Sequence, residues 1–178
     1  ELFNLITKAI ELEIPLLGIC GGHQYGAQAL TGSSFAVIEN PSGPNRGTSN
    51  LVFINGSADH PLFYGCSNNH LFQWSHASVV DKLPEGALRL AANTNAVYAA
   101  FQRSSFIGLQ FNPEFGALKQ TGFGVKLMQE ILTLHIAEAE TEEHRYQLEL
   151  ALDDLRPAPD SAKIFANWVE MIEAGFFK

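Results

Sequence analysis

The segment Leu-Leu-Gly-Ile-Cys-Gly-Gly-His-Gln at residues 16–24 constrains the fold of this chain most strongly. An apolar run ends there in a Gly-x-Cys-x-Gly turn, and a helical pattern follows it. This order is typical of a strand that enters a helix through a sharp nucleophile elbow, where small neighbours relieve steric crowding. The helix N-terminus also favours a thiolate. The sequence therefore predicts a strand–turn–helix unit with Cys20 as the first candidate for chemistry.

Hydrophobic periodicity predicts strands that alternate with helices, together with a patch of short strands. Apolar positions at helical spacing predict helices over residues 1–13, 22–30, 122–155 and 161 onward. Asp160 or Ser161 can cap the last of these helices. Apolar runs between turn signals predict strands over residues 14–19, 51–54, 71–74, 88–93, 96–102 and 106–110. Residues 32–50, rich in Gly, Ser, Pro and Asn, predict an irregular segment. We therefore expect an α/β fold with a mostly parallel central sheet, formed by one domain over residues 1–178.

Composition narrows the classes of partner. The formal net charge of −8 argues against a nucleic-acid partner, because only 11 Lys and Arg residues are present and they are spread thinly. No apolar run is long enough to span a membrane, so no membrane association is expected. Cys20 and Cys66 are too few for a disulfide framework, and a free elbow thiol fits a reducing compartment, which favours a cytoplasmic protein. The histidines show no metal-ligand spacing with each other or with cysteine, so no metal site is predicted.

Three blocks of sequence carry a resemblance to a known family. The elbow at 18–22 is followed by Trp-Ser-His at 74–76 with Leu-Pro-Glu-Gly at 83–86, and then by Gln-Phe-x-Pro-Glu at 110–114. In this order and spacing they resemble the class I glutamine amidotransferases, and within them the stand-alone proteins related to the amidotransferase domain of GMP synthase. The resemblance runs from about Leu12 to Trp168. It implies a three-layer, flavodoxin-like fold with helices on both sides of the sheet.

The resemblance also implies roles for individual residues. Cys20 would attack the side-chain amide of glutamine, ammonia would leave, and water would release glutamate from the acyl-enzyme. The backbone N–H of Gly21 would hold part of the oxyanion, as in other elbows. Gln24, at the start of the elbow helix, would contact the substrate. His76 would lie beside the substrate, either as a surrogate base or as a histidine fixed by structural hydrogen bonds. No cofactor is implied.

The third block departs from the family at the residue that matters most for catalysis. The family carries His-x-Glu there, whereas this chain carries Asn112, Pro113 and Glu114. An asparagine amide neither accepts a proton near neutral pH nor supplies the positive charge that stabilises a thiolate. Cys20 is therefore expected to return toward the ordinary thiol pKa of about 8.5. Glu114 either keeps its catalytic orientation or is tied to nearby donors. We predict little or no ordinary glutaminase turnover.

Three functions remain open on these residues. The first is hydrolysis of glutamine to glutamate and ammonia through Cys20, impaired by Asn112. The second is a non-catalytic module that binds glutamine or regulates a partner. The third is hydrolysis of γ-glutamyl peptides. The ligand in each catalytic case is glutamine or a γ-glutamyl compound, and a synthase or another acceptor of ammonia is the partner implied by the first.

The beginning of the chain also differs from the family pattern. Family members begin with a strand–helix–strand portion before the helix that starts here at Glu1. These N-terminal strands would flank the strand that carries Cys20. We expect a chain that lacks them, either as a truncated product or because a partner chain takes their place, since uncovered strand edges are aggregation-prone.

Overall fold

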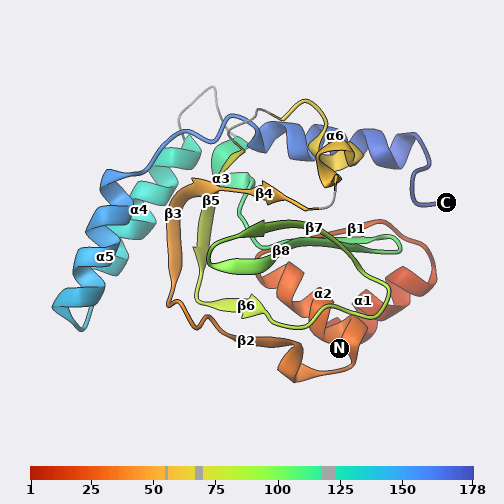
Figure 1. Ribbon diagram of the computed structural model, residues 1–178, viewed down its shortest axis with the longest axis horizontal. Helices are drawn as coiled ribbons and strands as arrows, with labels where there is room; N and C mark the ends of the chain where they lie inside the picture. The colour runs from red at the N-terminus through yellow and green to blue at the C-terminus, as the bar shows by residue number, and fades with distance from the viewer. Residues whose placement is uncertain (55, 67–69, 118–122) are drawn as a thin grey trace.

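The computed structural model describes residues 1–54, 56–66, 70–117 and 123–178, and in it a helix–strand–helix unit is followed by a series of strands and then by a series of helices (Figure 1). Three short 3₁₀ turns accompany the α-helices. The helices are α1 (Leu2–Glu11), α2 (Gly21–Thr31), η1 (Ser34–Ala36), η2 (Ser57–Asp59), η3 (Pro61–Phe63), α3 (Glu114–Ala117), α4 (Phe123–Ala137), α5 (Glu142–Asp153) and α6 (Ser161–Glu173). None of the helices in the described ranges is both long and apolar enough to cross a membrane.

The strands form one central sheet and two smaller ladders. They are β1 (Leu16–Ile19), β2 (Val37–Glu39), β3 (Asn45–Asn50), β4 (Val52–Phe53), β5 (Leu71–His76), β6 (Ser78–Val80), β7 (Leu88–Asn93), β8 (Ala96–Arg103) and β9 (Phe106–Leu109). The central sheet has the order β1-β9-β8-β7-β4, with β1 parallel to β9 and the other neighbours antiparallel. Two antiparallel ladders, β2 with β6 and β3 with β5, stand beside it. The predicted α/β class is confirmed, with a mixed central sheet.

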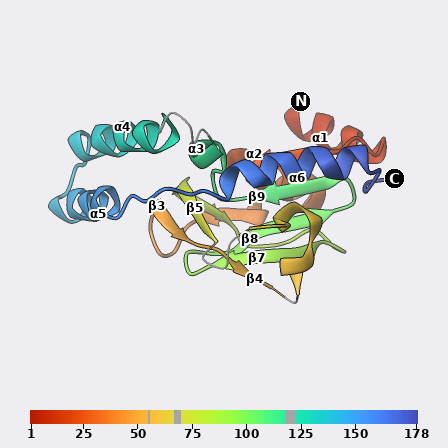
Figure 2. The same cartoon turned by 90° about the horizontal axis from the view of Figure 1, so that it is seen from above.

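Helices cover both faces of the central sheet, because successive residues of a strand point to opposite sides. On β9, Phe106 packs with Ile6 of α1 and Ala27 of α2, whereas Ile107 belongs to a core that includes Ile164 of α6. Figures 1 and 2 show α6 on one side of the sheet and the pair α1 and α2 on the other. The result is the three-layer arrangement expected from the resemblance.

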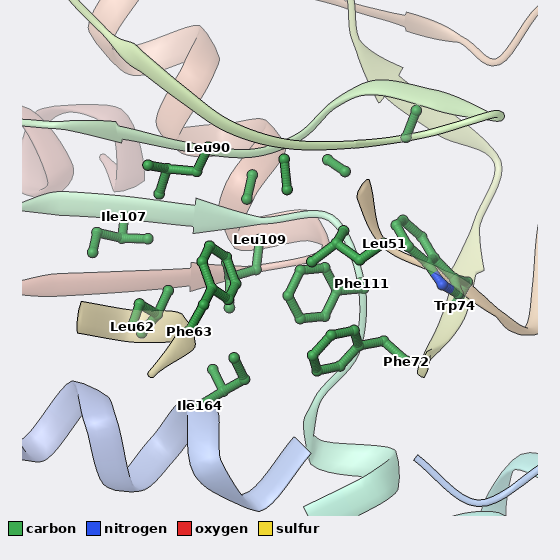
Figure 3. Close-up of a cluster of buried hydrophobic side chains, with 14 of the residues drawn as sticks. Leu51, Leu62, Phe63, Phe72, Trp74, Leu90, Ile107, Leu109, Phe111 and Ile164 are labelled. Carbon is green, nitrogen blue, oxygen red and sulfur yellow. The ribbon is translucent and has the colours of Figure 1, made fainter. Parts of the chain in front are cut away.

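The core under α6 ends in an aromatic cluster beside the third sequence block (Figure 3). Phe72, Trp74 and Phe111 have no measurable exposure, and the rings of Phe72 and Phe111 lie 4.3 Å apart between centroids. Burial of an aromatic side chain is strongly favourable, so Phe111 is held firmly in this core. It thereby fixes the path of the backbone between Gln110 and Asn112.

Several segments differ from the sequence-based expectation. The short elements β6 and α3 form where neither a strand nor a helix was predicted. Residues 37–50 form β2 and β3 where an irregular segment was predicted. The sequence of β3 is Asn-Arg-Gly-Thr-Ser-Asn, which has no apolar alternation, and it forms a strand because all six residues pair with β5. The helix predicted over 122–155 is two helices, because residues 138–141 interrupt it and the Thr141 side chain caps α5 by accepting a hydrogen bond from the His144 N–H. Its predicted start at Gly122 lies outside the described residues.

Candidate functional site

Cys20 lies at the junction of β1 and α2, where the parallel ladder ends and the helix begins. Its N–H donates to the Leu109 carbonyl of β9 at 2.7 Å, and its carbonyl accepts the first helical bond from the Gln24 N–H at 3.2 Å. Its backbone has φ 50° and ψ −105°, a left-handed conformation that is unfavourable for a residue with a side chain. Strain of this kind costs about 1–3 kcal/mol and persists where the surroundings enforce it. The predicted elbow geometry is therefore present.

The steric reason for the elbow is concentrated at one glycine. A Cβ on Gly18 would lie 2.7 Å from the carbonyl oxygen of Gly22 and 2.7 Å from the ring of Phe106, closer than real Cβ atoms approach. A Cβ on Gly22 would meet nothing within 4 Å, and one on Gly21 would meet only Tyr25 at 3.9 Å. The turn therefore needs a glycine before the cysteine, whereas the two glycines after it have room for a side chain.

The Cys20 thiol is surrounded by polar groups from three elements. It donates to the Ser75 carbonyl of β5 at 3.4 Å, and the amide nitrogen of Gln110 lies 3.9 Å from the sulfur. Burial raises the thiol pKa above its ordinary value, and the nearby Glu114 charge adds to this, while hydrogen bonds from Gly21 N–H and the Asn112 amide oppose it. The loss of imidazolium alone predicted an ordinary pKa. The structure adds a desolvation effect that shifts the thiol further toward its neutral form.

Asn112 is fixed on both sides of its amide. Its oxygen accepts from the Ser75 N–H at 3.2 Å, and its nitrogen donates to a Glu114 carboxylate oxygen at 2.7 Å. These partners determine the orientation of the amide, because an N–H only donates and an ionised carboxylate only accepts. Asn112 is 5 % exposed, so little water competes for these bonds. The chain from Glu114 through residue 112 to Cys20 is thus intact in space, with an amide in place of a titratable ring.

Glu114 has one oxygen in use and one buried without a partner. The first accepts from Asn112, and the second, Oε2, has no hydrogen-bond partner among the described residues. A buried carboxylate oxygen without a partner is costly. The arrangement matches a carboxylate that orients its neighbour and retains spare acceptor capacity toward the site.

Gln24 and Gln110 join the elbow helix to the neighbouring strands. The Gln24 amide nitrogen donates to the Ser78 carbonyl at 2.7 Å and to the Gln110 side-chain oxygen at 3.2 Å. Gln110 is fully buried at the end of β9 and also reaches Cys20. Sequence reasoning missed Gln110, although it stands in the third block, two residues before Asn112. A polar residue at the carboxyl end of a buried strand was the available signal.

His76 is committed to structural hydrogen bonds. Its Nδ1 faces the Ser78 carbonyl at 3.1 Å and its Nε2 faces the Asn45 amide nitrogen at 3.3 Å, so the neutral ring donates at Nδ1 and accepts at Nε2. Burial lowers its pKa to about 4, with a further contribution from Arg46. Of the two interpretations open from the sequence, this geometry favours a histidine fixed by structural bonds over a surrogate base.

His23 beneath the elbow has a packing role, and the described residues near the elbow do not form a metal site. His23 is fully buried beneath the elbow, where burial lowers its pKa to about 3, and its ring lies 5.1 Å from that of Phe101. Within the described residues, no group of three or more His, Cys, Asp or Glu side chains is arranged to hold a metal ion. The structure therefore brings Cys20, Gly21, Gln24, Asn112 and Glu114 to one place, with His76 in the adjoining β5–β6 corner.

Comparison with known proteins places this site in a family context. GMP synthase (glutamine-hydrolysing) of Wolinella succinogenes is 39 % identical over 115 residues, covering 62 % of this chain and 21 % of that protein. GMP synthase of Thermomicrobium roseum is 38 % identical over 111 residues, covering 62 % and 20 % respectively. The chain thus spans about a fifth of the length of these relatives.

A solved structure agrees at the level of the fold. A glutamine amidotransferase from Thermotoga maritima superposes with a TM-score of 0.69 at 24 % identity, covering 96 % of this chain and 67 % of that one. The family model described as glutamine amidotransferase class-I matches residues 1–149. With its elbow, its sheet and its third block in the corresponding order, this chain belongs to the class I glutamine amidotransferase family.

Proposed function

We propose that this chain is a glutamine-directed amidotransferase domain whose Cys20 can receive the γ-glutamyl group while hydrolysis is strongly reduced. One observation carries the proposal. Asn112 occupies the position of the base, held between the Ser75 N–H and the Glu114 carboxylate and facing the Cys20 thiol. The nucleophile, its turn and the orienting carboxylate are all retained, and the group that would move the proton is an amide.

The chemistry shows which step suffers most. Attack forms a carbon–sulfur bond and breaks the carbon–nitrogen bond of the glutamine amide, and the leaving ammonia must take up a proton. Cys20 must first lose its proton, which its raised pKa opposes. The Asn112 amide neither accepts that proton nor returns it to ammonia. Positioned acid–base groups typically contribute about 10² to 10⁴-fold, so a loss of this size is expected. The Gly21 N–H, which supports the Cys20 thiol in the free protein, would donate to the oxyanion once the carbon–sulfur bond forms.

A synthase or another acceptor of ammonia is the partner that fits this proposal. The relatives named above are glutamine-hydrolysing GMP synthases, and this chain matches about a fifth of their length. Ammonia is useful only where an acceptor consumes it. We infer that glutamine, or another γ-glutamyl compound, is the small-molecule ligand and that a synthase is the protein partner.

Calorimetric titration of glutamine, together with glutamate release, tests the proposal. The parent protein and Cys20→Ala should both bind glutamine saturably, and the parent should release glutamate only slightly faster than Cys20→Ala. Cys66→Ala is the matched control, since it removes the other thiol and should behave like the parent. Absence of glutamine binding would favour a protein-interaction module. Rapid release that Cys20→Ala abolishes would show an active enzyme with another base.

A γ-glutamyl peptide in the same assay separates the third possibility. Glutamate release from the peptide, but not from free glutamine, would show that the leaving group rather than the base limits the reaction. The proposal expects slow release from both, because both leaving amines need the proton that Asn112 does not supply.

A further inference from the structure

A cleft whose lining does not include Cys20 lies between the polar strand β3 and the helix α5. Its volume is about 950 Å³, and its lining includes Arg46 of β3, Asn95 of the β7–β8 turn, and His144 and Gln147 of α5. Figures 1 and 2 both show α5 beside β3 at the end of the molecule opposite the chain termini. Volumes of this order are typical of small-molecule sites. The cleft adjoins the site described above through Asn45, which lines it and contacts His76.

Arg46 is the unusual residue in the lining. Its side chain is half-buried, and neither an ion pair nor a hydrogen bond joins its guanidinium to any residue that the structure describes; its Nε is fully shielded from water. The Nε atoms of Arg89 and Arg145 are also buried without a hydrogen-bond partner among the described residues. Each of the other arginines nevertheless has a partner for its guanidinium: the Tyr98 ring for Arg89, the Glu85 carbonyl for Arg103, Glu142 for Arg145 and Asp154 for Arg156. Charged side chains are seldom buried unless they are paired. Arg46 therefore lacks the anion that its position calls for.

The charges around the cleft favour an anion as the missing partner. Arg46 stands opposite Ser75 of β5 in the β3–β5 ladder. Burial lowers the pKa of Arg46, and burial together with the Arg46 charge lowers the pKa values of His76 on β5 and His135 on α4. The two carboxylates in the lining are already engaged, because Glu143 accepts from Gln147 at 3.0 Å and Asp154 pairs with Arg156 at 3.0 Å. Of Arg46, Glu143 and Asp154, the charged side chains of the lining, only Arg46 has no hydrogen-bond or ion-pair partner among the described residues.

Two further polar side chains line the cleft beside this charge. The His144 Nε2 atom is buried and has no hydrogen-bond partner among the described residues, and the amide of Asn95 also lines the cleft. Arginine binds carboxylates and phosphates through two parallel N–H bonds, which makes it well suited to anchor such a group. We propose that this cleft binds a small polar molecule through a phosphate or carboxylate group held by Arg46.

Titration with two simple anions tests the proposal on the intact chain. Inorganic phosphate and succinate are added separately to ¹⁵N-labelled protein, and amide shifts are followed to saturation. At least one anion should shift the amides of residues around Arg46, Asn95 and Gln147, and the tighter anion identifies the group. Arg46→Gln should weaken binding about 10 to 100-fold, as expected for loss of charge-assisted hydrogen bonds. Arg46→Lys should retain part of the affinity.

Arg89→Gln is the matched control, because it removes the same charge from a half-buried strand arginine outside the cleft. Its binding should equal that of the parent. Failure of both anions to bind saturably, or equal binding by the parent and Arg46→Gln, would overturn the proposal.

Thermal unfolding without ligand gives an independent readout. Arg46→Gln should leave the midpoint unchanged or raise it, since it removes a half-buried charge that no described residue pairs with. A marked fall in the midpoint would mean that Arg46 serves the fold itself, and it would contradict the proposal.

Discussion

The geometry of the elbow around Cys20 and that of the facing corner, formed by Asn112, Glu114 and Ser75, are maintained by different kinds of interaction. At the elbow, backbone packing accompanies the strained conformation of Cys20, because the space beside Gly18 is closed to a side chain by the Gly22 carbonyl and the Phe106 ring. At the facing corner, side-chain hydrogen bonds hold Asn112 between Ser75 and Glu114. The first arrangement depends on the fold, and the second depends on one residue's functional groups. A single substitution can therefore remove the chemistry at the corner and leave the geometry of both regions intact.

The largest expected effect comes from restoring a titratable group at the corner. Asn112→His should raise glutamate release from glutamine by about 10² to 10⁴-fold, equivalent to roughly 3–5 kcal/mol of barrier, because the ring can accept the Cys20 proton and return it to ammonia. The Glu114 carboxylate that now accepts from Asn112 would orient the ring. Initial rates of glutamate formation measure the gain.

The double variant Cys20→Ala with Asn112→His is the control for this gain. It should fall to the background of Cys20→Ala alone, since the restored base acts through the thiol. If Asn112→His folds and binds glutamine yet releases no more glutamate than the parent, then the elbow has lost function as well. The view that only the corner has lost its chemistry would then be wrong.

His76 gives the next effect, and it appears in stability rather than in activity. Its pKa is about 4 in the folded chain against 6.5 for an ordinary histidine, so the unfolded chain takes up this proton first as the pH falls. The contribution of His76 to stability is complete above about pH 6.5 and is lost progressively down to about pH 4, amounting to about 3 kcal/mol at most.

Urea unfolding at several pH values measures this slope. His76→Gln should show a shallower loss of stability between pH 6.5 and pH 4 than the parent, whatever its stability at neutral pH. Its residual glutamate release should match the parent's, because the ring's two nitrogens are engaged by Ser78 and Asn45. Equal slopes would mean that His76 titrates normally and is free to act as a base.

A glycine pair tests the elbow side of the comparison. Gly18→Ala should destabilise the fold by about 1–3 kcal/mol through overpacking against the Gly22 carbonyl and Phe106. Gly22→Ala meets nothing within 4 Å and lies in α2, so it should leave stability unchanged or raise it by up to about 1 kcal/mol. Chemical unfolding of both variants provides the measurement. Equal losses would show that the turn needs small residues on both sides of the cysteine.

The contrast between the regions also explains what the sequence could predict. The elbow was predictable because a Gly-x-Cys-x-Gly turn after an apolar run is determined locally, and the position of Asn112 followed from its place in a block. The contacts of Cys20 with Ser75 and Gln110 depend on residues 55 and 90 positions away, which no local pattern reveals. The raised thiol pKa depends on burial, a property of the assembled fold.

The strand β3 is an element that the sequence did not predict, because it depends on long-range contacts. Its polar sequence gave no strand signal, and it is a strand through its pairing with β5. Gly47 in this strand has φ 90°, and a Cβ there would lie 3.1 Å from the Ala151 carbonyl of α5. The approach of α5 to β3, and with it the cleft around Arg46, therefore rests on long-range packing that periodicity does not encode.

The smallest expected effect is the one that links the two regions directly. Alkylation of Cys20 by iodoacetamide at pH 7 should be a few-fold slower than that of an unstructured cysteine peptide, because only the thiolate reacts and the raised pKa reduces its population. The rate should still be rising with pH above 8.5, the ordinary thiol value.

In Asn112→His the rate at pH 7 should increase, since an imidazolium stabilises the thiolate that an amide supports only weakly. Mass spectrometry assigns the label to Cys20 rather than to Cys66, whose pKa is raised to about 11. Alkylation of the parent as fast as that of Asn112→His would mean that the elbow alone activates the thiol, and the corner would then matter only for protonating ammonia.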